Sequence, residues 1–179
     1  FRVTRYHCVR GLKHIAVGHS EEVADHLEDL TSINDYQTSL VSTLHDSYED
    51  TREQTAETFG ILAKENVEAI LPYVGDLVYR LDDENETVQA KSLRALGYIE
   101  RDNHGAITTH TEHIATFLTD QPDPVQESAA FVFAEVAETN PDAIAEYDSP
   151  LASLLPADNL GARIEAARAL SYLKATQLE

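Results

Sequence analysis

Val88-Gln89-Ala90-Lys91-Ser92-Leu93-Arg94-Ala95-Leu96-Gly97 is the stretch that decides the fold, because similar stretches recur along the chain at one constant spacing. The copies begin at residues 51, 88, 125 and 162, which are 37 residues apart each time. A fixed period of this size is typical of a solenoid, in which each structural unit packs only against its neighbours and the stack presents a long surface. We therefore predict a tandem array of one repeated unit.

Each repeat contains two apolar segments of different length. Around Val88, apolar or small residues lie three and four positions apart, at Val88, Ser92, Leu93, Ala95, Leu96 and Ile99. That spacing is typical of an amphipathic α-helix. A shorter apolar segment precedes each copy, at residues 40–44, 77–81, 114–118 and 151–155. Asp, Asn and Pro lie between the two segments and suit helix caps and first turns. With no strand-like alternation in the sequence, we predict an all-α solenoid of antiparallel helix pairs, a short helix A followed by a longer helix B.

The third repeat carries the clearest resemblance to a known family. Its residues are Leu118-x-Asp120-x-Pro122-Asp123-Pro124-Val125-Gln126-x-x-Ala129-Ala130-x-Val132. This pattern resembles a HEAT-type repeat, in particular the HEAT-like variety first named in phycobilisome lyases, and residues 162–170 are similar to its helix B. The resemblance implies four HEAT-like repeats of about 37 residues over residues 36–179.

The same resemblance implies a ladder of ion pairs along the stack, between an Asp in the turn of each unit and an Arg early in helix B. Asp46, Asp83 and Asp120 match the Asp, whereas only Arg52 and Arg163 match the Arg. The remaining positions depart from the pattern, so we expect the ladder to be interrupted. The departures are Gln89, Gln126 and Ala157.

The N-terminal region departs from the period. Residues 8–15 resemble residues 92–99 of the second copy but lie 47 residues before their counterparts in the first, 55–62, and the ten extra residues fall near residues 28–36. We therefore assign residues 1–35 to an N-terminal partial repeat with an insertion. This partial repeat lacks a helix A, so a preceding segment or a partner should cover its uncapped helix. The chain contains no Met and begins at Phe1, so we expect the native start to lie upstream.

The chain is strongly acidic, with 32 acidic and 13 basic residues and a net charge of -19. Such a charge repels nucleic acid and anionic membranes, since both are bound by neutralising phosphates. One explanation is an acidic face that attracts a basic partner. The other is solubility in high salt, as in proteins of salt-loving archaea. The acidic residues are spread over every unit, and this favours the haloarchaeal, halophilic explanation.

Cys8 is the only cysteine, and no apolar run approaches the roughly 18 residues that a membrane span needs. A chain with one cysteine forms no internal disulfide, which suits a reducing compartment. We therefore expect a cytoplasmic protein without membrane insertion.

The candidate binding site lies on helix B, which lines the concave side in HEAT-type arrays. Two outward columns, one helical turn apart, run along the stack: Arg10, Glu57, Arg94, Phe131 and Arg168, then His14, Ile61, Tyr98, Glu135 and Tyr172. Arginine and aromatic residues dominate binding hot spots. We predict that a protein or peptide partner contacts Arg94, Tyr98, Phe131, Arg168, Tyr172, Arg10 and His14. In the alternative interpretation, the arginines pair with acids of adjacent units and the tyrosines are half-buried core.

Catalytic and metal-binding patterns are missing from the sequence. His110 and His113 lie at helical spacing near His104, and Cys8 follows His7, but the repeated ligand spacings of zinc modules do not occur. Nor does a Gly-rich phosphate loop, a G-x-S-x-G elbow or an H-E-x-x-H helix. We predict a non-enzymatic protein with no cofactor and no metal site.

The first nineteen residues are basic, with Arg2, Arg5, Arg10 and Lys13 and no acidic residue. This segment could contact a partner, another copy, nucleic acid, or acids of its own second unit such as those at 21, 22 and 25. Our first hypothesis for the whole chain is an interaction scaffold or adaptor. A lyase-like or chaperone-like subunit that acts on a cofactor-bearing protein is the alternative, and a nucleic-acid binder is the least favoured.

Overall fold

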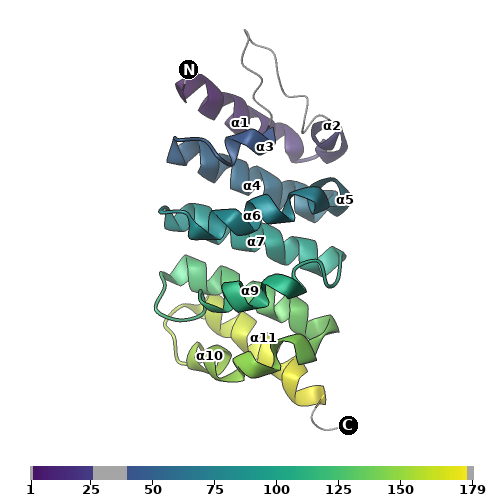
Figure 1. The fold of residues 1–179 in the computed structure, drawn as a ribbon, viewed down its shortest axis with the longest axis vertical. Coiled ribbons are helices and arrows are strands. Elements are labelled where there is room, and N and C mark those ends of the chain that lie inside the picture. The colour runs from purple at the N-terminus through teal and green to yellow at the C-terminus, as the bar shows by residue number, and fades with distance from the viewer. Residues whose placement is uncertain (1, 26–39, 177–179) are drawn as a thin grey trace.

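Four long helices, one in each repeat, form the spine of the molecule (Figure 1). The structure is a computed structural model, and it describes residues 2–25 and 40–176. The long B helices are α4 (Glu49–Glu65), α7 (Glu86–Asp102), α9 (Asp123–Thr139) and α11 (Leu160–Thr176), each of 17 residues. They begin 37 residues apart, and each contacts the next along the stack. No strand occurs in the described part of the chain, and the predicted all-α solenoid is confirmed.

The short helices lie side by side along one face of the B layer. The A helices are α3 (Leu40–Thr43), α6 (Val74–Tyr79), α8 (Thr111–Ala115) and α10 (Asp148–Ser153). Further short helical turns adjoin them, which the sequence pattern did not predict. These are α5 (Val67–Ile70), η1 (Leu71–Tyr73), η2 (Arg80–Asp82), η3 (Thr108–His110) and η4 (Pro141–Tyr147). The segment that connects one B helix to the next is therefore a series of short helical turns.

Helix α1 (Arg2–Ala16) forms the first layer and packs against α4, with the short α2 (Ser20–Ala24) beside it. Helix α1 begins 47 residues before α4, as the sequence spacing implies, and no A helix precedes it among the described residues. The expected insertion near residues 28–36, and with it the boundary between residues 35 and 36, lies outside the described residues.

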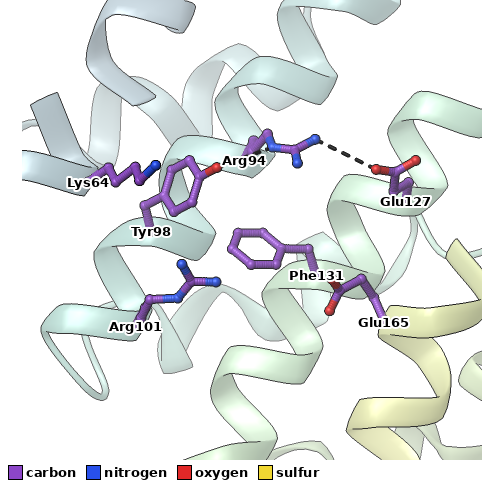
Figure 2. Close-up of a pocket in the computed structure, with 7 residues that line it drawn as sticks. All are labelled: Lys64, Arg94, Tyr98, Arg101, Glu127, Phe131 and Glu165. Atoms are coloured by element: carbon purple, nitrogen blue, oxygen red, sulfur yellow. Dashed lines mark hydrogen bonds and ion pairs between the residues drawn. The ribbon is translucent and has the colours of Figure 1, made fainter. Parts of the chain in front are cut away.

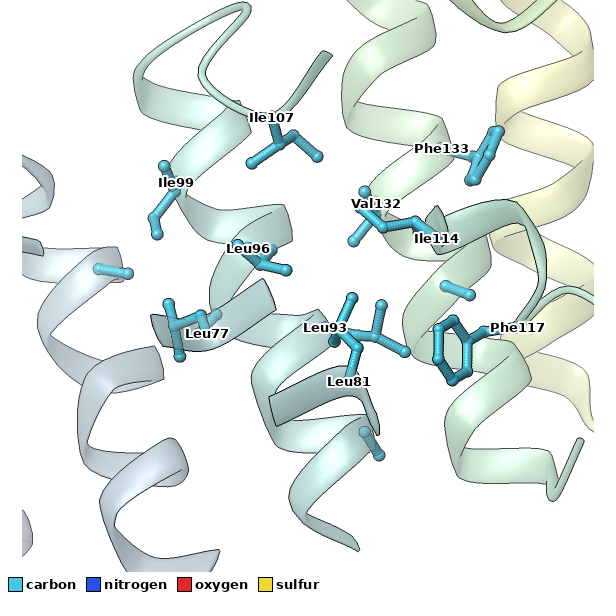
Figure 3. Close-up of a cluster of buried hydrophobic side chains, with 14 of the residues drawn as sticks. Leu77, Leu81, Leu93, Leu96, Ile99, Ile107, Ile114, Phe117, Val132 and Phe133 are labelled. Carbon is cyan, nitrogen blue, oxygen red and sulfur yellow. The ribbon is translucent and has the colours of Figure 1, made fainter. Parts of the chain in front are cut away.

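The core fills the space between the A and B sides of each unit and between successive units (Figure 3). Leu77 and Leu81 point from the A side toward Leu93 and Leu96 of α7. The column of large residues that recurs every 37 positions is fully buried at Phe59, Leu96 and Phe133. The same apolar period therefore defines both the helices and the layers between them.

Only the first part of the expected ion-pair ladder is formed. Arg52 of α4 donates from Nε and Nη2 to the two carboxylate oxygens of Asp83, at 2.7 and 2.8 Å. Burial alone would raise the pKa of Asp83, but the Arg52 guanidinium lowers it overall. Arg5 of α1 pairs with Asp46 in the same way, a rung the sequence pattern missed because the first unit is out of register.

The ladder ends after this second rung. Gln89 occupies the position of Arg52 in the next unit and donates to the backbone oxygen of Asp83 at 2.7 Å. Asp120 and Arg163 fit the family pattern, but neither forms an ion pair with another described residue. The predicted interruption is therefore found in the C-terminal half of the stack.

The basic helix α1 is held by acids of the neighbouring unit. Besides the Arg5 pair, Nζ of Lys13 donates to Gln54 Oε1 at 2.8 Å and to Glu57 Oε1 at 3.2 Å. The expectation that α1 packs on acids of its own chain holds for Arg5 and Lys13. The ion pairs of Arg5 and Lys13 go to α4 and the turn before it, not to the acids suggested at positions 21, 22 and 25, although α2, which contains two of these acids, also lies beside α1.

Within the described residues, no helix has the length and apolar character needed to cross a membrane.

Candidate functional site

Four of the predicted site residues meet on the surface of the B layer that lies away from the A helices, here called the B-helix face. Arg94 and Tyr98 come from α7, Phe131 from α9 and Arg168 from α11. Arg101, in the last turn of α7, joins them. These five residues are called the arginine–aromatic cluster below (Figure 2 shows four of them).

Phe131 forms the floor of this cluster. Its ring packs edge to face on Tyr98, with 5.4 Å between the ring centroids and an interplanar angle of 67°. The ring lies on the backbone of Gly97, where a Cβ atom would overlap it. Only 9% of Phe131 is exposed, so the expectation that its column faces outward was wrong at this position. The missing side chain at Gly97 lets the ring sink between α7 and α9.

Glu135 was also expected to face outward and is 3% exposed. Its Oε1 accepts hydrogen bonds from Nη2 of Arg101 at 2.7 Å and from Nη2 of Arg168 at 2.6 Å. Burial alone would raise the pKa of Glu135, but the two guanidinium groups lower it overall. A charged carboxylate therefore joins α7, α9 and α11 beneath the cluster.

The two guanidinium groups held by Glu135 also lie over aromatic rings. The Cζ atom of Arg101 is 5.1 Å from the ring centroid of Phe131 and 5.4 Å from that of Tyr98. The Cζ atom of Arg168 is 5.8 Å from the centroid of Phe131. These distances fall in the range of cation–π attraction. The cluster is therefore ordered by contacts of its own.

Arg94 is held more loosely than the other two arginines. Its Nε donates to the Tyr98 hydroxyl at 3.4 Å, and its Nη1 lies 3.6 Å from Oε1 of Glu127. The Tyr98 hydroxyl, and then the nearby carboxylates, raise the pKa of Arg94. Its side chain is 55% exposed. Arg94 therefore has donors free for a partner while Arg101 and Arg168 share a buried acid.

A cavity of about 180 Å³ opens beside the cluster, lined by Lys64, Arg94, Tyr98, Arg101, Glu127, Phe131 and Glu165 (Figure 2). The basic residues belong to α4 and α7, and the acidic residues to α9 and α11. Burial raises the pKa of Glu165. The cavity thus offers charges of both signs around an aromatic floor, a composition that suits the side chains of a peptide.

The other predicted site residues lie outside this cavity. Tyr172 is half-buried on α11, and burial together with Glu138 raises its pKa. Arg10 and His14 are exposed on α1, and the α4 layer lies between them and α7. Between the two groups, Glu57 binds Lys13 at 3.2 Å and Lys91 at 2.6 Å. The predicted columns are therefore divided by a neutralised segment at Glu57.

The sequence reasoning missed Lys64, Arg101, Glu127 and Glu165 as site residues. Lys64 and Arg101 occupy the same position in successive B helices, 37 residues apart, one turn beyond the second column. A third column, one helical turn beyond the second, would have included both Lys64 and Arg101. Glu127 and Glu165 carried no such signal among 32 acidic residues.

Histidines do not gather in the described part of the chain. No group of three or more His, Cys, Asp or Glu residues there has the arrangement to hold a metal ion. Nε2 of His113 lies 3.0 Å from Asp82, and Nδ1 of His104 lies 3.1 Å from the backbone oxygen of Glu100. The His113 contact joins two successive repeats, whereas the His104 contact is local to the end of α7.

The sequence matches no family model and no curated protein. Solved structures of designed repeat proteins have a similar fold. Computationally designed armadillo repeat proteins for modular peptide recognition give a TM-score of 0.75 at 22% identity, over 93% of this chain and 74% of theirs. An engineered protein gives 0.74 at 22% identity, over 95% and 90%. A designed armadillo repeat protein gives 0.68 at 20% identity, over 94% and 92%. These similarities show a helical repeat solenoid.

Proposed function

We propose that this chain is a non-enzymatic scaffold that binds a peptide or protein segment on its B-helix face, across the arginine–aromatic cluster. The observation that carries the proposal is the exposed Arg94 beside a cavity whose aromatic floor, Phe131, and second arginine, Arg101, are already held by contacts within the protein. A site whose side chains are held before binding loses less conformational entropy when the partner arrives. Arginine and tyrosine around a buried ring are also the residue types of binding hot spots.

A peptide fits this site better than a small molecule does. The cavity of about 180 Å³ is smaller than the range of about 300–1,000 Å³ for small-molecule pockets, and its lining residues come from four successive B helices. An extended segment could place one side chain in the cavity and run along the stack. The designed neighbours for modular peptide recognition support this choice of partner by analogy of fold.

The test uses peptides selected from a random library on the immobilised chain, with affinities measured by fluorescence anisotropy. The variant Arg94→Glu/Tyr98→Ala removes the exposed cation and one ring of the cluster. We expect it to weaken binding by about 30-fold or more, the loss typical of a hot spot.

The matched control is Arg163→Glu/Tyr79→Ala, which makes the same change in charge and loses the same ring at exposed positions outside the cluster. It should bind within about twofold of the wild type. Equal binding by all three proteins would remove the B-helix face from consideration. If the chain instead binds duplex DNA, with an affinity that falls steeply as salt increases, a nucleic-acid binder would be favoured.

We also propose that the repeats are of the HEAT-like kind and that the acidity is a haloarchaeal adaptation to high salt. The two formed rungs of the ladder, Arg5 with Asp46 and Arg52 with Asp83, support the first point. The second predicts that the free energy of unfolding rises with salt, because salt screens repulsion among the acids. Urea unfolding at low and molar KCl measures it, and lower stability in molar KCl would contradict this explanation.

A further inference from the structure

Two cations that line the cavity have no closely bound carboxylate. The central B helices α4, α7 and α9 contain five basic residues, and three of them have a carboxylate oxygen at 2.6 or 2.7 Å. These three are Arg52, Lys91 and Arg101. In contrast, Nη1 of Arg94 lies 3.6 Å from Glu127, and Lys64 forms no ion pair with another described residue. Because Lys64 and Arg94 line the same cavity, the unmatched positive charge of the central layers lies at one place.

Glu127 neutralises Arg94 only in part, because its carboxyl group lies against α11 as well. A Cβ atom at Gly161 would overlap this carboxyl group, so the group rests on the backbone of Gly161. Gly161 is the second residue of α11, and the first turn of a helix carries partial positive charge that stabilises a carboxylate. Arg94 is therefore left with donors for an anion from outside the protein.

Tyr98 adds a neutral donor to these two cations. Its hydroxyl oxygen accepts a hydrogen bond from Nε of Arg94 at 3.4 Å, and no described residue accepts the hydrogen of the hydroxyl. Lys64 and Arg94 lie on either side of Tyr98 (Figure 2). An ammonium, a guanidinium and a hydroxyl hydrogen thus line one cavity. A carboxylate suits this set of donors, since its two oxygens accept about four hydrogen bonds and bind cations strongly.

Given that the chain binds a peptide on its B-helix face, as proposed above, we propose that the peptide is anchored there by an acidic side chain. The carboxylate of this Asp or Glu accepts hydrogen bonds from Lys64, Arg94 and the Tyr98 hydroxyl. The cavity of about 180 Å³ is lined by residues of four successive B helices, so the peptide can continue along the stack on both sides of it. The carboxylate is therefore that of a side chain and not that of a chain end.

A basic anchor fits the cavity less well, although two acidic residues also line it. Oε2 of Glu165 is buried and lies 3.2 Å from Nε of Arg168. Glu127 is near Arg94 and rests on the first turn of α11. Both acids therefore already face positive charge. A basic side chain would also meet the three basic residues of the lining.

The rest of the chain limits the residues around the acidic anchor. With a net charge of -19, the protein repels a segment that contains several acidic residues. The same charge attracts basic residues on either side of the anchor. The expected partner segment is therefore one acidic residue among neutral and basic ones.

The experiment uses peptides selected on the immobilised wild type, acetylated at the N-terminus and amidated at the C-terminus, so that every carboxylate belongs to a side chain. We expect the selected peptides to share an Asp or Glu at one fixed position. Changing this residue to Asn or Gln should weaken binding to the wild type by about tenfold or more, the loss expected when a charge-assisted hydrogen bond is removed. Fluorescence anisotropy measures both affinities.

Lys64→Gln tests the protein side of the same contact. Lys64 is exposed in the last turn of α4, so the variant should fold. We expect it to bind the acidic peptide about fivefold more weakly and to bind the neutral peptide as the wild type does. The matched control is Lys174→Gln, which removes an exposed lysine from the last turn of α11 outside the cavity. The control should bind both peptides within about twofold of the wild type.

The outcomes separate the acidic anchor from the proposed function. Binding that depends on Arg94 and Tyr98 but is equal for the acidic and the neutral peptide would overturn the acidic anchor and leave the peptide scaffold standing. Equal effects of Lys64→Gln and Lys174→Gln, or selected peptides that share a basic anchor, would do the same. If no selected peptide responds to Arg94→Glu/Tyr98→Ala, the peptide site on the B-helix face and its acidic anchor are both wrong.

Discussion

The ring of Phe131 on α9 lies directly on the backbone of Gly97 on α7, where the Cβ atom of any other residue would overlap it. The ring then supports Tyr98, Arg101 and Arg168 above it. A residue with no side chain thus decides where the candidate site forms.

Gly97→Ala should destabilise the protein and disturb the cluster. Alanine is favoured over glycine in a helix by up to about 1 kcal/mol, but its Cβ would displace the Phe131 ring, and such overpacking costs about 1–3 kcal/mol. We expect a net loss of stability and a changed near-ultraviolet circular dichroism signal. The matched control is Gly60→Ala at the same position of α4, where the new Cβ makes an ordinary contact. That variant should gain up to about 1 kcal/mol. Similar stability changes for both would contradict the role of Gly97.

Glu135→Gln removes the shared carboxylate of Arg101 and Arg168. Each charge-assisted hydrogen bond contributes about 1.5–3 kcal/mol, but both arginines are partly exposed, so we expect a total loss of about 1–3 kcal/mol at neutral pH. Glu57→Gln loses two lysine contacts at a more exposed site and should cost less. Urea unfolding of the two variants measures the difference. A larger loss for Glu57→Gln would contradict it.

The same carboxylate sets a pH dependence. The pKa of Glu135 in the folded protein lies below its ordinary value of 4.5, so its stabilisation is fully present above pH 4.5 and is lost as the pH falls through the folded pKa. The wild type should therefore lose its stability advantage over Glu135→Gln on acidification below about pH 4.5. Glu165 has a raised pKa and acts in the opposite direction, so Glu165→Gln should gain stability above pH 4.5. Unfolding curves between pH 3 and 7 would show both trends, and parallel curves for all three proteins would refute the assignment.

Asp83→Asn should break the second rung of the ladder. The Asp83 side chain is 2% exposed and pairs with Arg52 and Arg80 while it accepts the backbone N–H of Asn85. Breaking a buried pair by removing one partner costs about 3–5 kcal/mol, and the slight exposure of the arginines favours the lower value. Asp120→Asn makes the same change at the equivalent exposed turn, where no rung forms, and should stay within about 0.5 kcal/mol. Thermal unfolding of the pair tests whether the ladder stabilises the stack.

Leu96→Ala and Phe133→Ala should each cost about 2–5 kcal/mol, because both side chains are fully buried between layers and their loss leaves a cavity. The exposed Leu155→Ala is the control and should cost far less. Changes below about 0.5 kcal/mol at both buried positions, measured by urea unfolding, would contradict the repeat register.

The sequence predicted the fold because a repeat needs the same core residues in every copy. Phe59, Leu96 and Phe133 recur every 37 residues, and each plugs the same space between layers. The period does not extend to the first unit, so the Arg5 rung was missed. The short helical turns on the A side were missed as well, because each is too short to show a helical spacing of apolar residues. Their signal was the repeat itself: Ile70, Ile107 and Ile144 are 37 residues apart and fully buried.

The site was predictable only in part. Arg94 and Tyr98 could be placed on the B-helix face because their direction depends only on their own helix. The burial of Phe131 and Glu135 depends on other layers: the space above Gly97 and the guanidinium groups of Arg101 and Arg168. The 37-residue period of the sequence by itself determined which residues build the layers, because the B helix of every layer has to bury the same row of apolar residues. The tertiary structure alone decided which outward residues stay exposed, because that depends on the side chains that neighbouring layers bring against them.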